Sequence, residues 1–189
     1  MSKGTTTNLE LFGKIEWAKV FEENRDKVGY KRNERSKGSY EDYDGACTVD
    51  MILDDENLDK LRKAGTAKDL DNKRNMTPDG YRVKFVRKFH IDGLPSLSGP
   101  PKVAHADGTP WDIDMDGLIG NGSVGVAYVH VYVPDDGEPA TTRLDGLQVI
   151  DHVPYESNYS PGPKFKDYSK SSGSSNSPTQ DLDDDDIPF

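Results

Sequence analysis

The sequence contains only one cysteine, Cys47, among its 189 residues. A single thiol excludes an intramolecular disulfide and a cysteine-rich zinc site. The strand-like pattern around Cys47 predicts a small buried apolar side chain rather than a redox centre. The histidines lack metal-site spacing, no glycine-rich phosphate loop precedes a helix, and no serine or cysteine nucleophile system is recognisable. We therefore expect no catalytic residue, no metal and no cofactor.

Long apolar segments are also missing. No run of about 18 apolar residues occurs, which is the length that a membrane-spanning helix needs. Residues 1–12 (MSKGTTTNLELF) lack the apolar stretch of a signal peptide. The sequence therefore predicts a soluble, cytoplasmic protein with no contact with a membrane.

Apolar residues are scarce in the C-terminal part of the chain. The hydrophobic fraction is 33% overall, and most of it lies before residue 155, which leaves enough for one core of ordinary size. Ser, Gly, Pro and Asn dominate residues 156–180, so this stretch is predicted to be a flexible linker. We expect one domain over residues 1–155, then the linker, then a separate peptide over residues 181–189.

Charges of opposite sign are concentrated in different parts of the chain. The net charge is −10, yet residues 1–95 hold 19 basic and 18 acidic side chains, and residues 96–189 hold 5 and 16. Ten basic residues fall within residues 60–88, against three acidic ones. Such a cluster can serve solubility alone, but in an acidic protein it also suits a surface for an anionic partner.

Alternating apolar side chains predict an all-β domain. Strand-like alternation occurs over residues 9–21, 47–54, 81–90, 124–133 and 144–153. One short helix is expected through Leu58 and Leu61, with Asp54 or Asp55 as its capping residue and Gly65 at its end. Several strands with long loops and one short helix are typical of a small barrel, and an OB-fold-like five-stranded barrel with a disordered C-terminal tail is the most specific prediction. The helix follows the second recognisable strand rather than the third, so a strand is hidden or inserted.

The last nine residues, DLDDDDIPF, join an acidic run to an apolar end. A tail that served only solubility would not need the apolar side chains of Ile187 and Phe189. Apolar residues next to negative charge are instead typical of a peptide that binds an apolar pocket with basic residues at its rim. The ending Asp-Asp-Asp-Ile-Pro-Phe resembles the C-terminal peptide of bacterial single-stranded DNA-binding proteins. Residues 80–155, with LIGNGSVGVAYVHVYV and LDGLQVIDHVPYE, also resemble single-stranded DNA-binding proteins of tailed bacteriophages.

This resemblance implies a function for the tail. In the bacterial family the peptide recruits replication, recombination and repair enzymes, such as a polymerase, primase, helicase, exonuclease or recombination mediator, and competes weakly with DNA for the protein's own basic surface. By resemblance, the partner-binding residues are Asp183, Asp184, Asp185, Asp186, Ile187, Pro188 and Phe189. A phage-encoded protein of this kind would act in the cytoplasm or nucleoid of the bacterial host.

The body contains the residue types that single-stranded DNA requires, namely cations for phosphates and aromatic faces for unstacked bases. Residues 24–43 interleave basic side chains with tyrosines, and in an OB-fold they would form the long loop after the first strand. The candidate DNA-binding residues are Trp17, Tyr30, Lys31, Arg32, Arg35, Tyr43, Lys73, Arg74, Arg82, Lys84, Lys88, His90, Trp111, Tyr128 and Tyr132. Tyr30 is the expected stacking residue of the loop, and ordinary barrel packing is the alternative for each aromatic.

One acidic segment suggests a different chemistry. Residues 112–123 (DIDMDGLIGNGS) begin like a calcium-binding loop, with Asp112, Asp114 and Asp116 at the expected spacing. The twelfth position is Ser123 rather than the bidentate glutamate, which argues against calcium. The same carboxylates would serve a two-metal nuclease if further ligands lay close to them.

The sequence as a whole predicts a non-enzymatic protein that coats and protects single-stranded DNA in phage DNA replication, recombination or repair. Binding should be independent of sequence, because stacking accepts every base and phosphate contacts carry no code. Two alternatives stay open: a magnesium-dependent nuclease built on the Asp112 cluster, and an acidic adaptor that docks host repair enzymes without touching DNA. A monomer is preferred, because no heptad pattern or exposed strand run indicates an oligomer.

Overall fold

The computed structural model describes residues 3–156 of the chain. The predicted C-terminal peptide, including the partner-binding residues Asp183 to Phe189, lies outside the described residues, as does nearly all of the predicted linker. Within residues 3–156 no helix is long and apolar enough to span a membrane.

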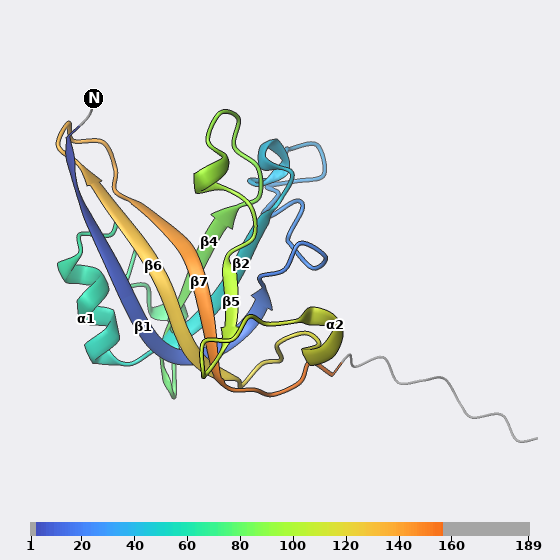
Figure 1. Ribbon diagram of the computed structural model, residues 1–189. Coiled ribbons are helices and arrows are strands. Elements are labelled where there is room, and N and C mark those ends of the chain that lie inside the picture. Colours follow the sequence, from blue (N-terminus) through green and yellow to red (C-terminus); the bar gives the residue numbers. More distant parts are fainter. Residues whose placement is uncertain (1–2, 157–189) are drawn as a thin grey trace, which may run out of the picture. The chain divides into compact units, whose positions relative to one another are not determined.

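Seven strands form one strongly curved sheet, with β1, β6 and β7 crossing in front of β2 and β4 (Figure 1). The strands are β1 (Gly4–Lys19), β2 (Ala46–Leu53), β3 (Met76–Thr77), β4 (Gly80–Lys88), β5 (Lys102–His105), β6 (Val124–Pro134) and β7 (Thr141–Asp151). The helices are α1 (Asp55–Lys63) and α2 (Ile113–Asp116), with short 3-10 turns η1 (Glu41–Tyr43), η2 (Lys73–Asn75) and η3 (Pro95–Leu97).

The strand order is β3-β4-β2-β1-β6-β7-β5. The long first strand β1 pairs antiparallel with both β2 and β6, so the five long strands run β4-β2-β1-β6-β7. This arrangement confirms the prediction of an all-β, OB-fold-like domain. The short strands β3 and β5 and the four-residue helix α2 add to the predicted elements. Among the described residues no backbone ladder joins β4 to β7, so the barrel is not closed by backbone hydrogen bonds.

The core follows from the period of two along each strand. Apolar side chains of β1, β2, β4, β6 and β7 that face the same side are fully or nearly fully buried: Leu11, Ile15, Val49, Met51, Leu53, Val83, Phe85, Ala127, Val129, Leu144 and Leu147. Cys47 on β2 is also completely buried, as predicted. The buried face leaves the alternate side chains of β4 and β6 on the outside of the barrel.

Helix α1 forms where the sequence predicts it. The Asp54 side chain accepts a hydrogen bond from the Asn57 backbone N–H at 2.9 Å, which caps the first turn. Leu58 and Leu61 are buried in the core. The Asn57 side-chain oxygen accepts a hydrogen bond from the Phe12 backbone N–H at 3.1 Å, and this contact attaches α1 to β1.

Trp17, one of the candidate DNA-binding residues, lies at an irregularity of β1. The pairing of β1 with β2 shifts register between Glu16 and Lys19, and Trp17 has a φ of 49°. Its backbone N–H donates to the Asn121 side-chain oxygen at 2.7 Å instead of continuing the ladder. This bulge turns the indole outward, so that Trp17 is 60% exposed.

Candidate nucleic-acid interface

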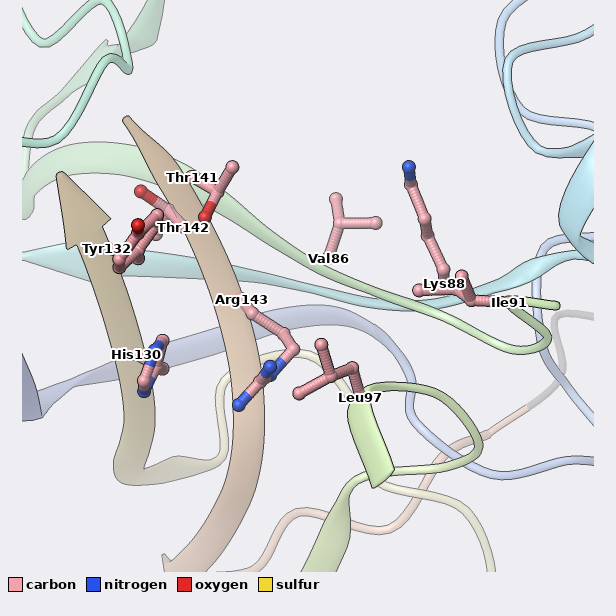
Figure 2. Close-up of a pocket in the computed structure, with 9 residues that line it drawn as sticks. All are labelled: Val86, Lys88, Ile91, Leu97, His130, Tyr132, Thr141, Thr142 and Arg143. Atoms are coloured by element: carbon pink, nitrogen blue, oxygen red, sulfur yellow. The ribbon is translucent and has the colours of Figure 1, made fainter. Parts of the chain in front are cut away.

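A groove of about 520 Å³ lies between the end of β4 and the hairpin formed by β6 and β7 (Figure 2). It is lined by Val86, Lys88, Ile91, Leu97, His130, Tyr132, Thr141, Thr142 and Arg143. The first four come from β4 and the segment after it, and the others come from the hairpin.

Strand alternation places these side chains. On β4, Val83 and Phe85 point into the core, so Val86 and Lys88 point outward. On the hairpin, Tyr132 lies opposite Thr141 and His130 lies opposite Arg143 across the β6–β7 ladder. Residues directly opposite each other in an antiparallel pair share a face of the sheet. Much of the groove is therefore lined from outward-facing strand positions, and Ile91 and Leu97 come from the irregular segment after β4.

Cations mark both sides of the groove. The Lys88 Nζ atom lies 3.9 Å from the ring centroid of Tyr43, and this contact draws η1 of the loop after β1 to the edge of the groove. Lys84 lies four residues before Lys88 on the same face of β4, and its Nζ atom is 3.6 Å from the Asp50 carboxylate. Burial raises the pKa of Asp50, and the positive charge of Lys84 opposes that rise.

On the opposite wall, Arg143 is held by Asp145. The Arg143 Nε and Nη2 atoms donate to the two carboxylate oxygens of Asp145 at 2.6 and 3.1 Å. Burial alone would raise the pKa of Asp145, but the hydrogen bond and positive charge of Arg143, together with the charge of Arg87, lower it. Asp145 is therefore charged at neutral pH and fixes the orientation of a groove-lining guanidinium.

The rest of the groove is aliphatic or aromatic. Val86, Ile91 and Leu97 form an apolar wall, and Tyr132 offers an aromatic ring on the facing strand (Figure 2). Nucleobases stack on aromatic rings and pack against apolar surfaces, while phosphates require cations at the edge. Both kinds of group are present in this groove.

Of the predicted DNA-binding residues, Lys88 and Tyr132 line the groove, and Tyr43 contacts Lys88. Lys84 lies on the same face of β4 as Lys88 but does not line the groove. The loop residues Tyr30, Lys31, Arg32 and Arg35 lie within the long connection between β1 and β2. Tyr30 is 79% exposed, as a stacking residue would have to be. Lys31 forms an ion pair with Glu41 at 2.8 Å.

The other predicted residues lie elsewhere on the surface. Lys73 and Arg74 are exposed on η2, where Lys73 lines a separate hollow beside α1. Arg82 is paired with Glu16 at 2.6 Å, and the His90 ring contacts the Asp92 carboxylate at 2.9 Å, past the end of β4. None of these four predicted residues lines the groove described above.

Two of the three remaining predicted aromatics, Trp111 and Tyr128, have side-chain partners. Trp111 is half-buried, stacks on His105 with ring centroids 4.6 Å apart, and meets His152 edge-on at 4.7 Å. The Tyr128 hydroxyl donates to the Gln148 side-chain oxygen at 2.9 Å. Trp17 lies at the β1 bulge. The contacts of Trp111 and Tyr128 correspond to the packing alternative that the sequence left open, whereas the side chain of Trp17 is exposed.

Sequence reasoning missed Arg143, His130 and the aliphatic wall. Arg143 is one of only five basic residues after residue 95, and that rarity was an available signal. The predicted last strand began at residue 144, whereas β7 begins at Thr141, so Arg143 was left in a loop. Ile91 and Leu97 lie in an irregular segment around η3, where no periodic pattern identifies a binding wall.

The acidic segment uses its carboxylates for local structure. Asp112 caps α2 by accepting from the Asp114 backbone N–H at 3.0 Å. Asp116 accepts from the Asp112 backbone N–H and contacts the His105 ring, both at 2.9 Å. The first of these bonds is the main cause of the lowered pKa of Asp116. Within residues 3–156, no group of three or more His, Cys, Asp or Glu side chains is placed to hold a metal ion.

No protein-family model matches this chain, and no curated protein matches it in sequence. Among solved structures it is similar to the single-stranded DNA-binding protein from bacteriophage Enc34 in complex with single-stranded DNA, at 8% identity, over 79% of this chain and 89% of that chain, with a TM-score of 0.48. It is also similar to gp2.5, a single-stranded DNA-binding protein encoded by bacteriophage T7, at 12% identity, over 83% and 92%, with a TM-score of 0.43.

Proposed function

We propose that this protein binds single-stranded DNA in the groove between β4 and the β6–β7 hairpin. The observation that carries the proposal is the combination of Lys88 and Arg143 on facing walls with Tyr132 and an aliphatic surface between them. Lys88 and Arg143 would contact phosphates, and Tyr132 would stack on a base, a contact that contributes about 1–3 kcal/mol. The protein would act without catalysis, by coating and protecting the strand.

The binding mode follows from these side chains. Phosphate contacts carry no sequence information, and an aromatic face accepts any base, so binding would be independent of sequence. Tyr30 and the basic residues of the loop between β1 and β2 would extend the contact beyond the groove, next to Tyr43 and Lys88. Lys73, Arg74, Arg82, His90, Trp17, Trp111 and Tyr128 remain candidates on other parts of the surface.

The C-terminal sequence supports a second part of the proposal. Residues 181–189 resemble the peptide with which bacterial single-stranded DNA-binding proteins recruit replication, recombination and repair enzymes. Phe189 would be the apolar anchor, Ile187 the second apolar contact, and Asp183 to Asp186 the electrostatic guide toward a basic rim. The protein would thereby bring such enzymes to the strand that it covers, in the cytoplasm of a phage-infected cell.

Titration of the full chain with labelled oligo-dT, matched duplex and oligo-U at about 50 and 200 mM salt tests the DNA proposal. We expect tighter binding to oligo-dT than to duplex, with a steep loss at higher salt. Arg143→Gln and Lys88→Gln should each reduce the slope of log K against log salt by about 1. Tyr132→Ala should weaken binding by about 1–3 kcal/mol.

Lys63→Gln is the matched control, because Lys63 is an exposed lysine on α1 outside the groove. It should leave the affinity unchanged. If Lys73→Gln weakens binding while the groove variants do not, DNA lies on the η2 surface instead. If the wild-type chain binds neither single strand, the adaptor alternative is favoured. Cleavage of labelled DNA in the presence of Mg²⁺ or Mn²⁺ would favour the nuclease alternative.

A further inference from the structure

Arg87 occupies an unusual position for a charged residue. It lies on β4 opposite Cys47 of β2, on the side of the strand that faces the interior. Only 11% of its side chain is exposed. Burial lowers the pKa of Arg87, and the negative charge of Asp145 opposes that effect. A guanidinium remains charged in proteins, so this residue has to find acceptors within the fold.

The acceptors come from two other segments. The Arg87 Nη1 atom donates to the Asp145 carboxylate of β7 at 2.8 Å. Its Nε and Nη2 atoms donate to the backbone oxygens of Gly99 and Ser98, each at 3.0 Å. Arg87 thus joins β4 to β7 and to the segment that directly follows η3.

These contacts lie where the sheet is open. No backbone ladder joins β4 to β7 among the described residues, so side chains hold the two strands together at this edge. Elsewhere in the barrel, neighbouring long strands share continuous ladders, as between β2 and β4. The relative position of β4 and β7 therefore depends on the Arg87 fork more than on backbone pairing.

Both ends of this network reach the groove. Asp145 binds Arg87 and Arg143 at the same time, and Arg143 lines the hairpin wall. Ser98 and Gly99 directly follow Leu97, which lines the opposite wall. One buried guanidinium is therefore connected to both walls, although Arg87 does not line the groove itself.

We infer that Arg87 is a positioning residue that sets the separation of the two groove walls, by tying β4 to Asp145 on β7 and to the backbone at Ser98 and Gly99. The part of this inference that concerns DNA rests on the proposed function. Lysine cannot reproduce the role, because an ammonium group is a point charge and lacks the planar fork that reaches three acceptors. Loss of the fork would leave Arg143 and Leu97 present but displaced from each other.

The test compares Arg87→Lys with the wild-type full chain in two measurements. Hydrogen exchange without DNA should become faster at Gly99, whose N–H is bonded to the Phe89 oxygen, and at residues 141–146. Affinity for oligo-dT should fall roughly tenfold with an unchanged salt slope, because no phosphate contact is removed. Arg143→Gln, in contrast, should reduce the slope by about 1.

Two further variants complete the design. Asp145→Asn removes the anionic partner of Arg87 by an isosteric change. It should make hydrogen exchange faster at Gly99 and at residues 141–146, and this variant provides the test even if Arg87→Lys does not fold. Arg62→Lys is the matched control. Arg62 is a surface residue of α1 that forms ion pairs with two carboxylates, Asp59 on the same helix and Asp71 in the segment after it. This variant should alter neither exchange near the groove nor binding.

Two results would overturn the inference. A reduced salt slope in Arg87→Lys would mean that Arg87 contacts phosphate directly. Unchanged exchange at Gly99 and at residues 141–146 in both Arg87→Lys and Asp145→Asn would mean that the network does not position the walls. If wild-type protein fails to bind oligo-dT, the proposed function fails, and the exchange measurement still decides the role of Arg87.

Discussion

At the scale of single residues, burial changes the chemistry of Cys47. The thiol is completely buried on β2, and burial raises its pKa to about 11. At pH 8 almost all of the thiol is therefore protonated and shielded from solvent, and the thiolate is the reactive form. We expect no reaction with a chromogenic disulfide reagent in native buffer and complete reaction in denaturant. Rapid labelling of the native protein would contradict this burial.

Two other residues show what alternation along a strand does and does not predict. Arg143 sits on a regular strand, and placing the start of β7 three residues earlier would have identified it as outward-facing. Trp17 could not be placed in this way, because its exposure depends on a bulge and on a hydrogen bond to Asn121, more than a hundred residues away in the chain. A local pattern carries no information about such a contact.

At the scale of an element, the N-cap of α1 gives a test of helix stability. The hydrogen bond from the Asn57 backbone N–H is the main cause of the lowered pKa of Asp54. A lowered pKa in the folded state means that the stabilisation is present above the ordinary value of 3.8 and is lost as the pH falls through the folded-state value. Asp54→Ala should therefore reduce the free energy of unfolding by about 1 kcal/mol at pH 7.

Urea unfolding at pH 7 and at pH 3 measures this effect, and the difference from wild type should shrink at the lower pH. Asp59→Ala is the control on the same helix, because Asp59 makes only a surface ion pair with Arg62. Such pairs contribute about 0–1 kcal/mol. If Asp54→Ala and Asp59→Ala reduced the free energy of unfolding equally, the N-cap would not stabilise the helix more than a surface ion pair does.

The long elements were predictable from the sequence and the short ones were not. Over residues 124–133, alternation indicated both the strand and its buried residues, because each inward side chain is apolar. The strands β3 and β5 have only two and four residues, too few for a period to emerge. The groove was predicted in part, since outward cations on β4 were visible, whereas the facing wall depends on how the hairpin meets β4 in space.

At the scale of the whole molecule, charge governs the expected binding. The net charge is −10, and residues 181–189 contain five aspartates, so a negative background remains on the body even without them. Cations grouped at the groove have to attract DNA against this background, and binding should weaken strongly with salt. By its resemblance to the bacterial peptide, the acidic tail is expected to compete with DNA for the same cations.

Deletion of residues 181–189 should therefore tighten binding to oligo-dT, most clearly at low salt, and should abolish recruitment of partner enzymes. Fluorescence anisotropy at several salt concentrations measures the first effect. Replacement of Asp183 to Asp186 by asparagine is the matched control, because it removes charge and keeps Ile187 and Phe189. Unchanged affinity in both variants would argue against competition by the tail.

The pairing of β1 with β6 also determines when the chain can fold. Asn8 on β1 contacts His130 on β6, which lies 122 positions later. At a synthesis rate of roughly 5–20 residues per second, β1 emerges about 6–25 s before β6, the second of its two partner strands, exists. Folding that depends on such distant contacts is slow. During this interval the edge of β1 that later pairs with β6 is unpaired in the nascent chain, and an unpaired strand edge is a site for aggregation.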